Sequence, residues 1–249
     1  MRRVTAPPSE PVPASRGAQT RQLIVDTALR LFLSQGYEAT TMRVIAAEAG
    51  VSVGNAYYYF PSKQHLVQAY YSHSQELHGA AARVPLDTET DFEPRLLGVL
   101  RARLDSMQSE KDFATAFFRY AADPASPLSP FSEESGPARD MSIALYEEAV
   151  RGSRLKVPPE LREELPELLW LYQMGVVLYW VHDASPGSMK TYALVDRTVP
   201  LVVRLIGLAR YRVLRGLVGD LLDLVRDLRG DGSITSTPPH QSDPRSDRA

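Results

Sequence analysis

The chain has no cysteine among its 249 residues, and only four of its 28 basic residues are lysine. Without a thiol the protein can form no disulfide, no thiolate metal site and no cysteine nucleophile, which fits a reducing compartment, so we expect a cytoplasmic protein. No apolar run reaches membrane-spanning length, and Arg2 and Arg3 are followed by the polar, proline-rich stretch TAPPSEPVPAS. The sequence therefore predicts neither a signal peptide nor a membrane segment.

Motifs that start an enzymatic interpretation are missing as well. The sequence has no G-x-G-x-x-G, P-loop or G-x-S-x-G pattern. His73 and His78 are five residues apart, which places them on different faces of a helix, and no third ligand stands at metal-site spacing. His182 beside Asp183 resembles a relay pair, but a surface or pocket-edge role is favoured. We expect no catalytic residue, no metal and no cofactor, and an enzyme is disfavoured.

The stretch 40–63, TTMRVIAAEAGVSVGNAYYYFPSK, is the most informative part of the chain. Thr41 precedes an alanine-rich run and can cap a helix, because a threonine oxygen accepts from the free N–H groups of a first turn. Gly50 ends that helix, since glycine enters the left-handed conformation without a Cβ clash, and Ser52 can cap a second helix that Pro61 stops. Two short helices joined by such a turn indicate a helix-turn-helix.

Three consecutive tyrosines, Tyr57, Tyr58 and Tyr59, lie on the second of these helices. At about 100° per residue they cannot all face a core, so at least one presents its ring or hydroxyl to solvent or to a partner. An exposed row of tyrosines on a capped helix indicates a binding partner.

Residues 20–66 join several anchors at fixed spacing: Gly-Tyr, Thr-Thr, Ala-Gly-Val-Ser, Gly-x-x-Tyr-Tyr-x-Phe and Pro-Ser-Lys. This combination resembles the DNA-binding domain of TetR-family transcriptional regulators. The resemblance implies a three-helix DNA-reading domain followed by a divergent, all-helical C-terminal domain. It also implies a homodimer that binds a near-palindromic double-stranded DNA operator, and release from DNA when a small molecule enters the C-terminal domain.

The resemblance also implies which residues meet DNA. Thr41 and Lys63 would touch phosphates, whereas Tyr57 and Tyr58 would contact phosphates, base edges or thymine methyl groups. Asn55 is the best candidate for reading a base. The full set of candidates is Thr41, Arg43, Ser52, Val53, Gly54, Asn55, Tyr57, Tyr58, Tyr59 and Lys63.

Positive charge is scarce for a DNA-binding protein. The formal net charge of the chain is −2, and residues 1–79 carry seven basic against five acidic side chains. The resembling family commonly has lysine where this chain has Val53, so one usual cation is missing. Gly54 allows close approach to the DNA backbone, and Arg43 could reach a phosphate or a guanine, although Arg43 and Asn55 could also be solvated surface residues. We expect a modest salt dependence of binding.

The rest of the chain predicts an all-α fold. The expected helices cover residues 20–36, 41–49, 52–60, 63–83, 94–109, 112–121, 139–152, 160–182, 188–208 and 210–228, with caps at Thr20, Ser62 and Ser188 and a stop at Pro85. The proline-rich segment 123–137 is expected to be a loop, either an ordered flap or mobile. The expected domains are a mobile arm (1–18), a helix-turn-helix DNA-binding domain (19–65), a larger helical ligand-binding and dimerisation domain (66–229) and a disordered tail (230–249).

The stretch 160–182 is apolar all round, so it should be buried on every face. Its own subunit can cover one side and a symmetric partner the other, which favours a homodimer over a monomer that encloses this helix completely. By resemblance, 160–182 and 188–208 would pair with their copies as a four-helix bundle.

Aromatic residues of the C-terminal part could line a pocket for a small apolar or aromatic effector. The candidates are Phe113, Phe117, Phe118, Tyr120, Trp170, Tyr172, Met174 and Tyr179. Aromatic stripes at helical spacing are more often core, and Trp180 belongs to the same stripe. Two interpretations thus stay open: a ligand-responsive repressor, and a TetR-like regulator whose C-terminal domain binds a protein partner or no ligand.

Overall fold

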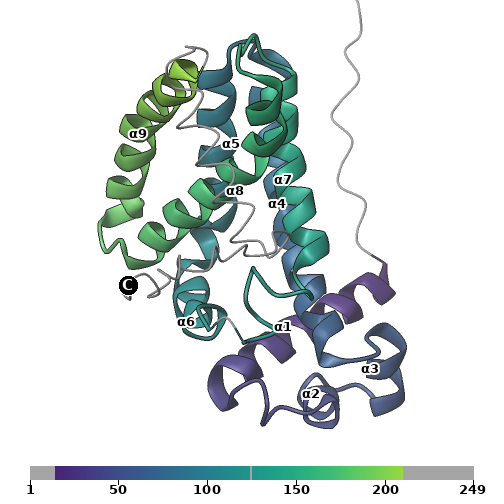
Figure 1. Cartoon of the computed structure of the whole chain (residues 1–249). Coiled ribbons are helices and arrows are strands. Elements are labelled where there is room, and N and C mark those ends of the chain that lie inside the picture. The colour runs from purple at the N-terminus through teal and green to yellow at the C-terminus, as the bar shows by residue number, and fades with distance from the viewer. Residues whose placement is uncertain (1–14, 124, 210–249) are drawn as a thin grey trace, which may run out of the picture.

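The computed structural model describes residues 15–123 and 125–209, which form helices and no strand (Figure 1). The expected all-α fold is confirmed. The elements are α1 (Arg16–Gln35), α2 (Met42–Glu48), α3 (Val53–Tyr59), α4 (Lys63–Thr88), α5 (Phe92–Met107), η1 (Gln108–Glu110), α6 (Lys111–Ala121), α7 (Gly136–Arg151), α8 (Pro159–His182), η2 (Pro186–Ser188) and α9 (Met189–Leu208). The predicted last helix, 210–228, and the predicted tail, 230–249, lie outside the described residues.

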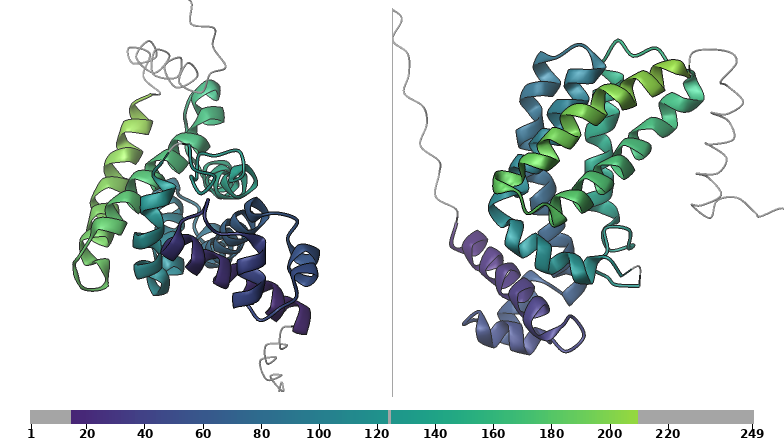
Figure 2. Two further views of the ribbon diagram at one scale, coloured as in Figure 1. Left: turned by 90° about the horizontal axis from the view of Figure 1, so that it is seen from below. Right: turned by 90° about the vertical axis from the view of Figure 1, so that its left-hand side faces the viewer.

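Helices α1 to α3 form a small head at one end of the molecule, and α4 leads from the head into the body (Figures 1 and 2). The predicted caps of the helix-turn-helix are confirmed: Thr41 Oγ1 accepts from the Val44 N–H at 3.3 Å, and Ser52 Oγ accepts from the Asn55 N–H at 3.1 Å. Gly50 has a φ of 66°, the left-handed conformation that the turn requires. The side chains that fill the head are buried, among them Ile24, Ala28, Phe32, Ile45, Ala56, Phe60 and Leu66.

The first helix begins earlier than the sequence predicts. Ser15 is its N-cap and accepts from the Ala18 N–H at 3.2 Å, whereas Thr20 lies one turn inside the helix and donates to the Arg16 carbonyl at 2.9 Å. Residues 16–18 therefore belong to α1 rather than to an arm. The prediction of a start at Thr20 failed because serine and threonine are both good N-caps, and the helix begins at the earlier of the two, directly after the proline-rich segment.

Pro85 does not end α4, which continues to Thr88. Leu86 is buried and holds the last turn against the body. The buried Arg95 of α5 donates from Nη1 to the Leu86 carbonyl at 2.5 Å and to the Glu89 carbonyl at 2.7 Å. These contacts compensate for the hydrogen bond that proline cannot donate, so the helix survives its proline.

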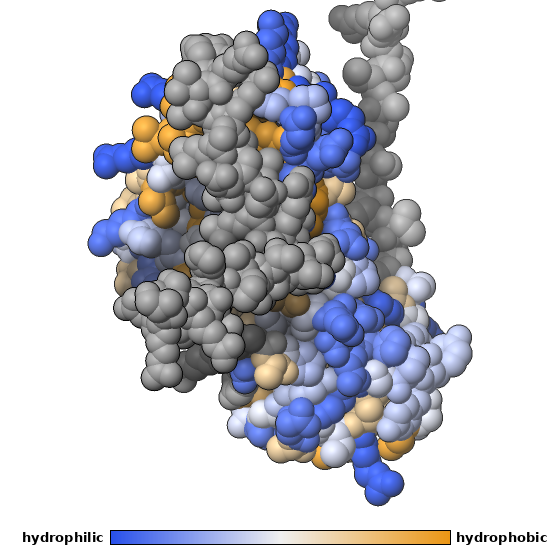
Figure 3. All heavy atoms as spheres, in the orientation of Figure 1, coloured by the Kyte–Doolittle hydropathy of each residue, from blue (hydrophilic) through white to orange (hydrophobic). Residues whose placement is uncertain are grey.

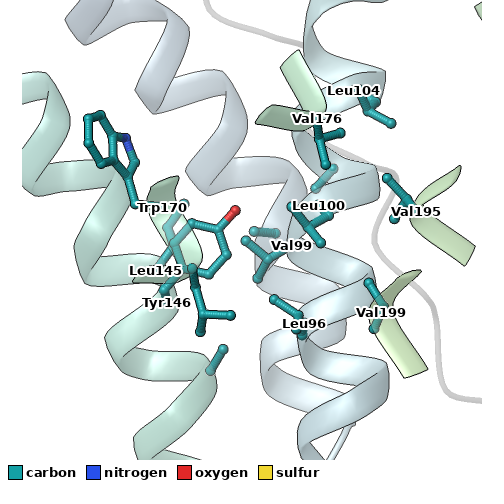
Figure 4. Close-up of a cluster of buried hydrophobic side chains, with 14 of the residues drawn as sticks. Leu96, Val99, Leu100, Leu104, Leu145, Tyr146, Trp170, Val176, Val195 and Val199 are labelled. Atoms are coloured by element: carbon teal, nitrogen blue, oxygen red, sulfur yellow. The ribbon is translucent and has the colours of Figure 1, made fainter. Parts of the chain in front are cut away.

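The core of the body lies between α5, α7, α8 and α9 (Figure 4). Its α5 side carries Leu96, Val99, Leu100 and Leu104, and facing them are Leu145, Tyr146, Trp170, Val176, Val195 and Val199. The one polar group of Tyr146 is satisfied, because its hydroxyl donates to Gln173 Oε1 at 2.7 Å and Gln173 in turn donates to Ser142 Oγ at 3.2 Å. A satisfied buried network of this kind fixes the register of α7 against α8.

Asp183, not Ser188, supplies the side-chain hydrogen bonds at the start of α9, so the predicted capping role of Ser188 is wrong. Ser188 has a φ of 57° and makes no side-chain cap bond, and its hydroxyl instead accepts from Lys111 Nζ at 2.7 Å. Asp183 Oδ2 accepts from the Thr191 N–H at 2.9 Å, and Asp183 Oδ1 accepts from the Ser185 N–H at 2.9 Å. Burial opposes ionisation here, but the hydrogen bonds from Ser185 and Thr191 prevail and hold the pKa of the Asp183 carboxyl far below its usual range.

Three smaller predictions also need correction. Helix α5 begins at Phe92 rather than at 94, and α7 begins at Gly136 rather than at 139. Ser62 stands at the N-cap of α4, but its hydroxyl bonds the His65 ring instead of the helix backbone. Such one-turn errors at helix ends arise because several residues near each end can serve as a cap.

Candidate nucleic-acid interface and effector cavity

Helix α3 presents an exposed face at the end of the head. Tyr58 is 80% exposed and Tyr57 is 50% exposed, and Val53 on the preceding turn is 38% exposed. Gly54 and Asn55 lie on the same helix and are exposed as well. Ala56 and Phe60 point the other way into the head core and hold α3 in place. The head thus offers one helix with aromatic and amide groups directed outward.

Tyr59 behaves differently from its two neighbours. Its ring is half-buried and packs against the head core, and its hydroxyl oxygen lies 3.4 Å from the position that a Cβ on Gly17 of α1 would take. The ring also meets Tyr58 edge-on, with centroids 5.2 Å apart. Tyr59 therefore contributes to holding α3 on α1, and its predicted DNA contact remains a prediction.

The candidate cations lie on either side of α3. Arg43 on α2 is exposed, and among the described residues it makes no side-chain hydrogen bond or ion pair. Lys63 Nζ donates to the Tyr37 carbonyl at 2.6 Å and sits 4.2 Å from the centroid of the Tyr37 ring. Lys63 thereby ties the α1–α2 connection to the start of α4. The two cap residues, Thr41 and Ser52, use their oxygens for backbone N–H groups and keep their hydroxyl protons for a partner.

The body contains a cavity of about 530 Å³ between α4, α5, α6, α7 and α8, closed on one side by the segment 129–131. The volume lies within the range of ligand-binding pockets. Most of its wall is apolar, and the polar side chains at the wall come from Ser74, Gln75, Arg103, Ser129, Ser135 and Arg139.

Four of the eight predicted ligand-binding residues line this cavity, namely Phe117, Phe118, Trp170 and Met174. Phe113 packs beside Phe117 and Tyr70 against the hydrophobic cluster that fills the head, here called the head cluster. Tyr172 bonds Thr198 of α9 at 2.5 Å, and Tyr179 is 43% exposed. These three residues are not among those that line the cavity, and the side chain of Tyr120 lies outside the described part of the structure.

Sequence reasoning missed several residues of the cavity wall. Tyr70 and Tyr71 of α4 contribute two aromatic rings, and Phe131 meets Trp170 edge-on at 5.2 Å. Arg103 is the most informative omission. It falls seven residues after Leu96, in register with the buried stripe of α5, and a charge on such a stripe is a signal that could have identified it.

The loop that covers the cavity is an ordered one. Leu128 at its centre is fully buried, and the Leu128 carbonyl accepts from the Tyr71 hydroxyl at 2.5 Å. Ser135 Oγ donates to the Ser129 carbonyl at 2.7 Å, and Arg139 donates to the Pro130 carbonyl at 3.2 Å. Of the two expectations for this segment, the ordered flap agrees with these contacts.

The histidines and acids do not assemble a metal site among the described residues. His78 is fully buried, and its Nε2 donates to the Val99 carbonyl at 3.0 Å. Desolvation, reinforced by the positive charge of Arg103, lowers the pKa of His78 to about 3, so the ring is neutral and joins α4 to α5.

None of the helices that the structure describes has both the length and the hydropathy of a membrane-spanning segment.

A capped helix-turn-helix with an exposed second helix, carried on a helical body with an internal cavity, defines a DNA-binding regulator. Comparison with known families agrees. The profile of the bacterial regulatory proteins of the tetR family matches residues 24–70, and that of the tetracyclin repressor-like C-terminal domain matches residues 95–227, which is more than half of the chain. The protein belongs to the TetR family of transcriptional regulators, as its sequence motifs predicted.

Individual relatives match over part of the chain. The uncharacterised regulator YvkB of Bacillus subtilis is 33% identical over 103 residues, which are 41% of this chain and 53% of YvkB. The repressor KstR of Rhodococcus jostii is 49% identical over 49 residues, 20% of this chain and 23% of KstR. The chain thus spans about half or less of the length of these relatives.

Solved structures resemble the whole described fold. A TetR-family regulator from Syntrophomonas wolfei superposes with a TM-score of 0.62 at 18% identity, covering 74% of this chain and 95% of that one. The fatty acid degradation regulator FadR of Bacillus halodurans superposes with a TM-score of 0.55 at 17% identity, covering 73% and 97%. At such identities the likeness establishes the fold.

Proposed function

We propose that the protein is a ligand-responsive repressor that binds a near-palindromic operator as a homodimer and leaves it when a small molecule occupies the cavity. The observation that carries the proposal is the exposed face of α3, where Tyr58 is 80% exposed with no role in the core of the head. A tyrosine ring that is exposed on a capped helix and packs against no core residue is expected to contact a binding partner. KstR of Rhodococcus jostii, which is similar over 49 residues, is named a transcriptional repressor.

In this proposal α3 enters the major groove as the recognition helix. Tyr57 and Tyr58 meet phosphates and thymine methyl groups, and Asn55 hydrogen-bonds a base edge. Arg43 contacts a phosphate from the neighbouring helix. Val53 offers no charge, so few cations are released from the DNA on binding and the salt dependence stays modest.

Dimerisation is proposed through α8 and α9, which lie side by side along one face of the body (Figure 2). The single chain leaves part of α8 uncovered, since Leu171 is 38% and Leu178 46% exposed, and the prediction assigns this side of the helix to a symmetric partner. On α9, Leu201 is 53% and Leu205 66% exposed. Hydrophobic side chains gather on the α9 side of the surface (Figure 3). An apolar surface spread over two adjacent antiparallel helices is what a four-helix bundle between two copies would bury.

Release by a ligand needs a connection between cavity and head, and the aromatic residues of α4 provide one. The Tyr70 and Tyr71 side chains line the cavity and at the same time pack against the head cluster. Phe117, whose ring centroid is 5.5 Å from that of Tyr70, belongs to both as well. A ligand that displaces these rings would tilt α4 and change the spacing of the two heads.

The experiment is selection of binding sites from a random DNA pool, followed by affinity measurements on the enriched site. The proposal expects two inverted half-sites with centres roughly one helical turn, or a multiple of it, apart. An enriched site without two-fold symmetry would refute the dimeric arrangement, and the absence of any enrichment would refute DNA reading by α3.

The second candidate is a regulator whose body binds a protein partner or no ligand. The cavity of about 530 Å³ favours a ligand-responsive body, since a largely apolar concave site of this volume is typical of small-molecule sites. A thermal-shift screen separates the two, because a compound that binds the folded state raises the melting temperature.

A further inference from the structure

Arg103 of α5 is a buried charge whose hydrogen bonds are incomplete. The residue is 7% exposed and lies at the cavity wall. Its Nη1 donates to Ser74 of α4, at 3.0 Å to the hydroxyl and 3.4 Å to the carbonyl. Its Nε is fully buried and has no hydrogen-bond partner. Within the described part of the chain Nη2 makes no hydrogen bond either, and no carboxylate lies within ion-pair distance of Arg103.

The other arginines of the body show what a structural arginine looks like here. Arg95 is equally buried, and its three nitrogens donate to the carbonyls of Leu86, Ala149 and Glu148, among others. Arg139 at the opposite wall of the cavity donates from Nη1 to the carbonyls of Pro130 and Ser132. Arg95 and the partly exposed Arg139 each hold a chain segment through backbone carbonyls. Arg103 is buried, and its guanidinium bonds only Ser74 among the described residues and leaves its enclosed Nε without a partner.

No neighbour neutralises the charge of Arg103. Desolvation raises the pKa of the Tyr70, Tyr71 and Tyr146 phenols, so all three are neutral at physiological pH. Desolvation likewise lowers the pKa of the Arg103 guanidinium, and an arginine still keeps its proton in such a site. The cavity is therefore apolar over most of its wall and carries two guanidinium groups, those of Arg103 and Arg139, of which only Arg103 is buried. The Glu110 carboxylate favours the charged form of Arg103 from beyond ion-pair distance.

We infer that the effector is an organic carboxylate with an apolar body, whose carboxylate pairs with Nη2 of Arg103 and, once the guanidinium turns toward the cavity, with the enclosed Nε. This inference rests on the proposed function and specifies its ligand. The two donors form the planar fork that binds a carboxylate with two parallel hydrogen bonds. The apolar body then lies against Phe118, Met174 and Trp170.

The same geometry links the ligand to the head. Arg103 is already fastened through Ser74 to α4, the helix that begins at the head. A carboxylate that draws the guanidinium toward the cavity pulls on Ser74, four residues after Tyr70, and so acts on the helix whose tilt positions α3. Charge recognition and release from DNA would then use one side chain.

The test compares matched acids and amides on the full-length protein. The probes are 2-naphthoate against 2-naphthamide and dodecanoate against dodecanamide, measured by thermal shift and calorimetry with wild type, Arg103→Met and Arg139→Met. Wild type is expected to bind at least one acid roughly 10- to 100-fold more tightly than its amide, since hydrogen bonds to a charged group contribute that much. Arg103→Met is expected to lose this preference, and Arg139→Met, the control from the same cavity, is expected to keep it.

The ligand-free protein gives a second readout. Replacing an incompletely paired buried charge by an apolar side chain of similar length is neutral or stabilising, so the melting temperature of Arg103→Met should equal or exceed that of wild type. A clear fall in melting temperature would make Arg103 a structural residue and overturn the inference. Equal affinity for acid and amide in wild type, or no stabilisation by either acid, would overturn it as well.

Operator binding by the ligand-free variants is measured in parallel. If Arg103→Met binds operator normally and the acid preference is absent from wild type, only the ligand class is wrong. If wild type binds no operator, the proposed function itself fails, whatever the ligands do.

Discussion

Substitution of Gly98 by alanine tests the packing between α4 and α5, the pair of helices that carries Tyr70, Ser74 and Arg103. A Cβ at Gly98 would lie 2.2 Å from Pro85 Cβ and 2.6 Å from Pro85 Cγ. Carbon atoms in contact prefer about 3.5–4.0 Å, and the proline ring cannot rotate away, so the two helices must separate by about 1 Å. Such overpacking costs about 1–3 kcal/mol.

Helix propensity works in the opposite direction. Alanine in place of glycine stabilises a helix by about 1 kcal/mol, so the net effect of Gly98→Ala is expected to lie between no change and a loss of about 2 kcal/mol. Gly79→Ala is the matched control, because a Cβ at Gly79 of α4 would meet nothing within 4 Å. The control should gain about 0.5–1 kcal/mol from propensity alone.

The assay is chemical denaturation of Gly98→Ala, Gly79→Ala, Pro85→Gly and the double variant Pro85→Gly/Gly98→Ala. Glycine at position 85 removes both clashing atoms, Cβ and Cγ, and leaves Pro85 Cα at an ordinary contact distance of 3.7 Å. Relative to Pro85→Gly, the double variant is therefore expected to recover at least 0.5 kcal/mol of the loss, roughly the smallest coupling that a double-mutant cycle resolves. Gly98→Ala as stable as Gly79→Ala would refute the close approach of Pro85 to α5.

Three further predictions concern the proposed interfaces and the α8–α9 corner. Tyr58→Ala should weaken operator binding roughly tenfold or more while the melting temperature stays unchanged, and unaltered affinity would argue against α3 as recognition helix. In light scattering, Leu205→Glu on α9 should be a monomer. The control Val84→Glu, at an α4 residue that is 69% exposed, should stay a dimer. Two monomeric variants, or two dimeric ones, would contradict the α8–α9 interface. Asp183→Asn should be less stable than wild type at neutral pH, and the difference in stability should narrow as the pH falls below the ordinary carboxyl pKa. The reason is that a carboxyl group whose pKa is lowered by folding stabilises the folded state only while it is ionised. A pH-independent difference in thermal denaturation would refute the assignment of an ionised Asp183 at the α8–α9 corner.

The fold could be predicted from the sequence where one residue type fits a position. Gly50 and Ser52 determine the turn of the helix-turn-helix, and both stand where the sequence predicted. The ends of α1 and α4 could not be predicted, because they depend on competition between caps and on distant partners. Pro85 predicts a stop on local grounds, whereas the burial of Leu86 and the contacts from Arg95, ten residues after Pro85, hold the last turn in the structure.

The candidate site divides in the same way. Tyr58 is exposed as an amphipathic argument requires, and its neighbour Tyr59 is partly buried by the same helical periodicity. The cavity was only half predicted, because aromatic character marks core and pocket alike. Tyr172 and Trp170 look equivalent in sequence, but one bonds α9 and the other faces the cavity. A charge on a buried stripe, as at Arg103, would have been the better guide.

Footprinting of the purified protein on the promoter region beside its own gene, at two salt concentrations, tests the central claim most directly. The account predicts protection of one palindromic site that spans about two helical turns, with a modest loss of affinity at the higher salt and loss of protection in Tyr58→Ala. Protection that lacks two-fold symmetry, or that Tyr58→Ala leaves intact, would contradict the assignment of α3 as the helix with which this regulator reads DNA.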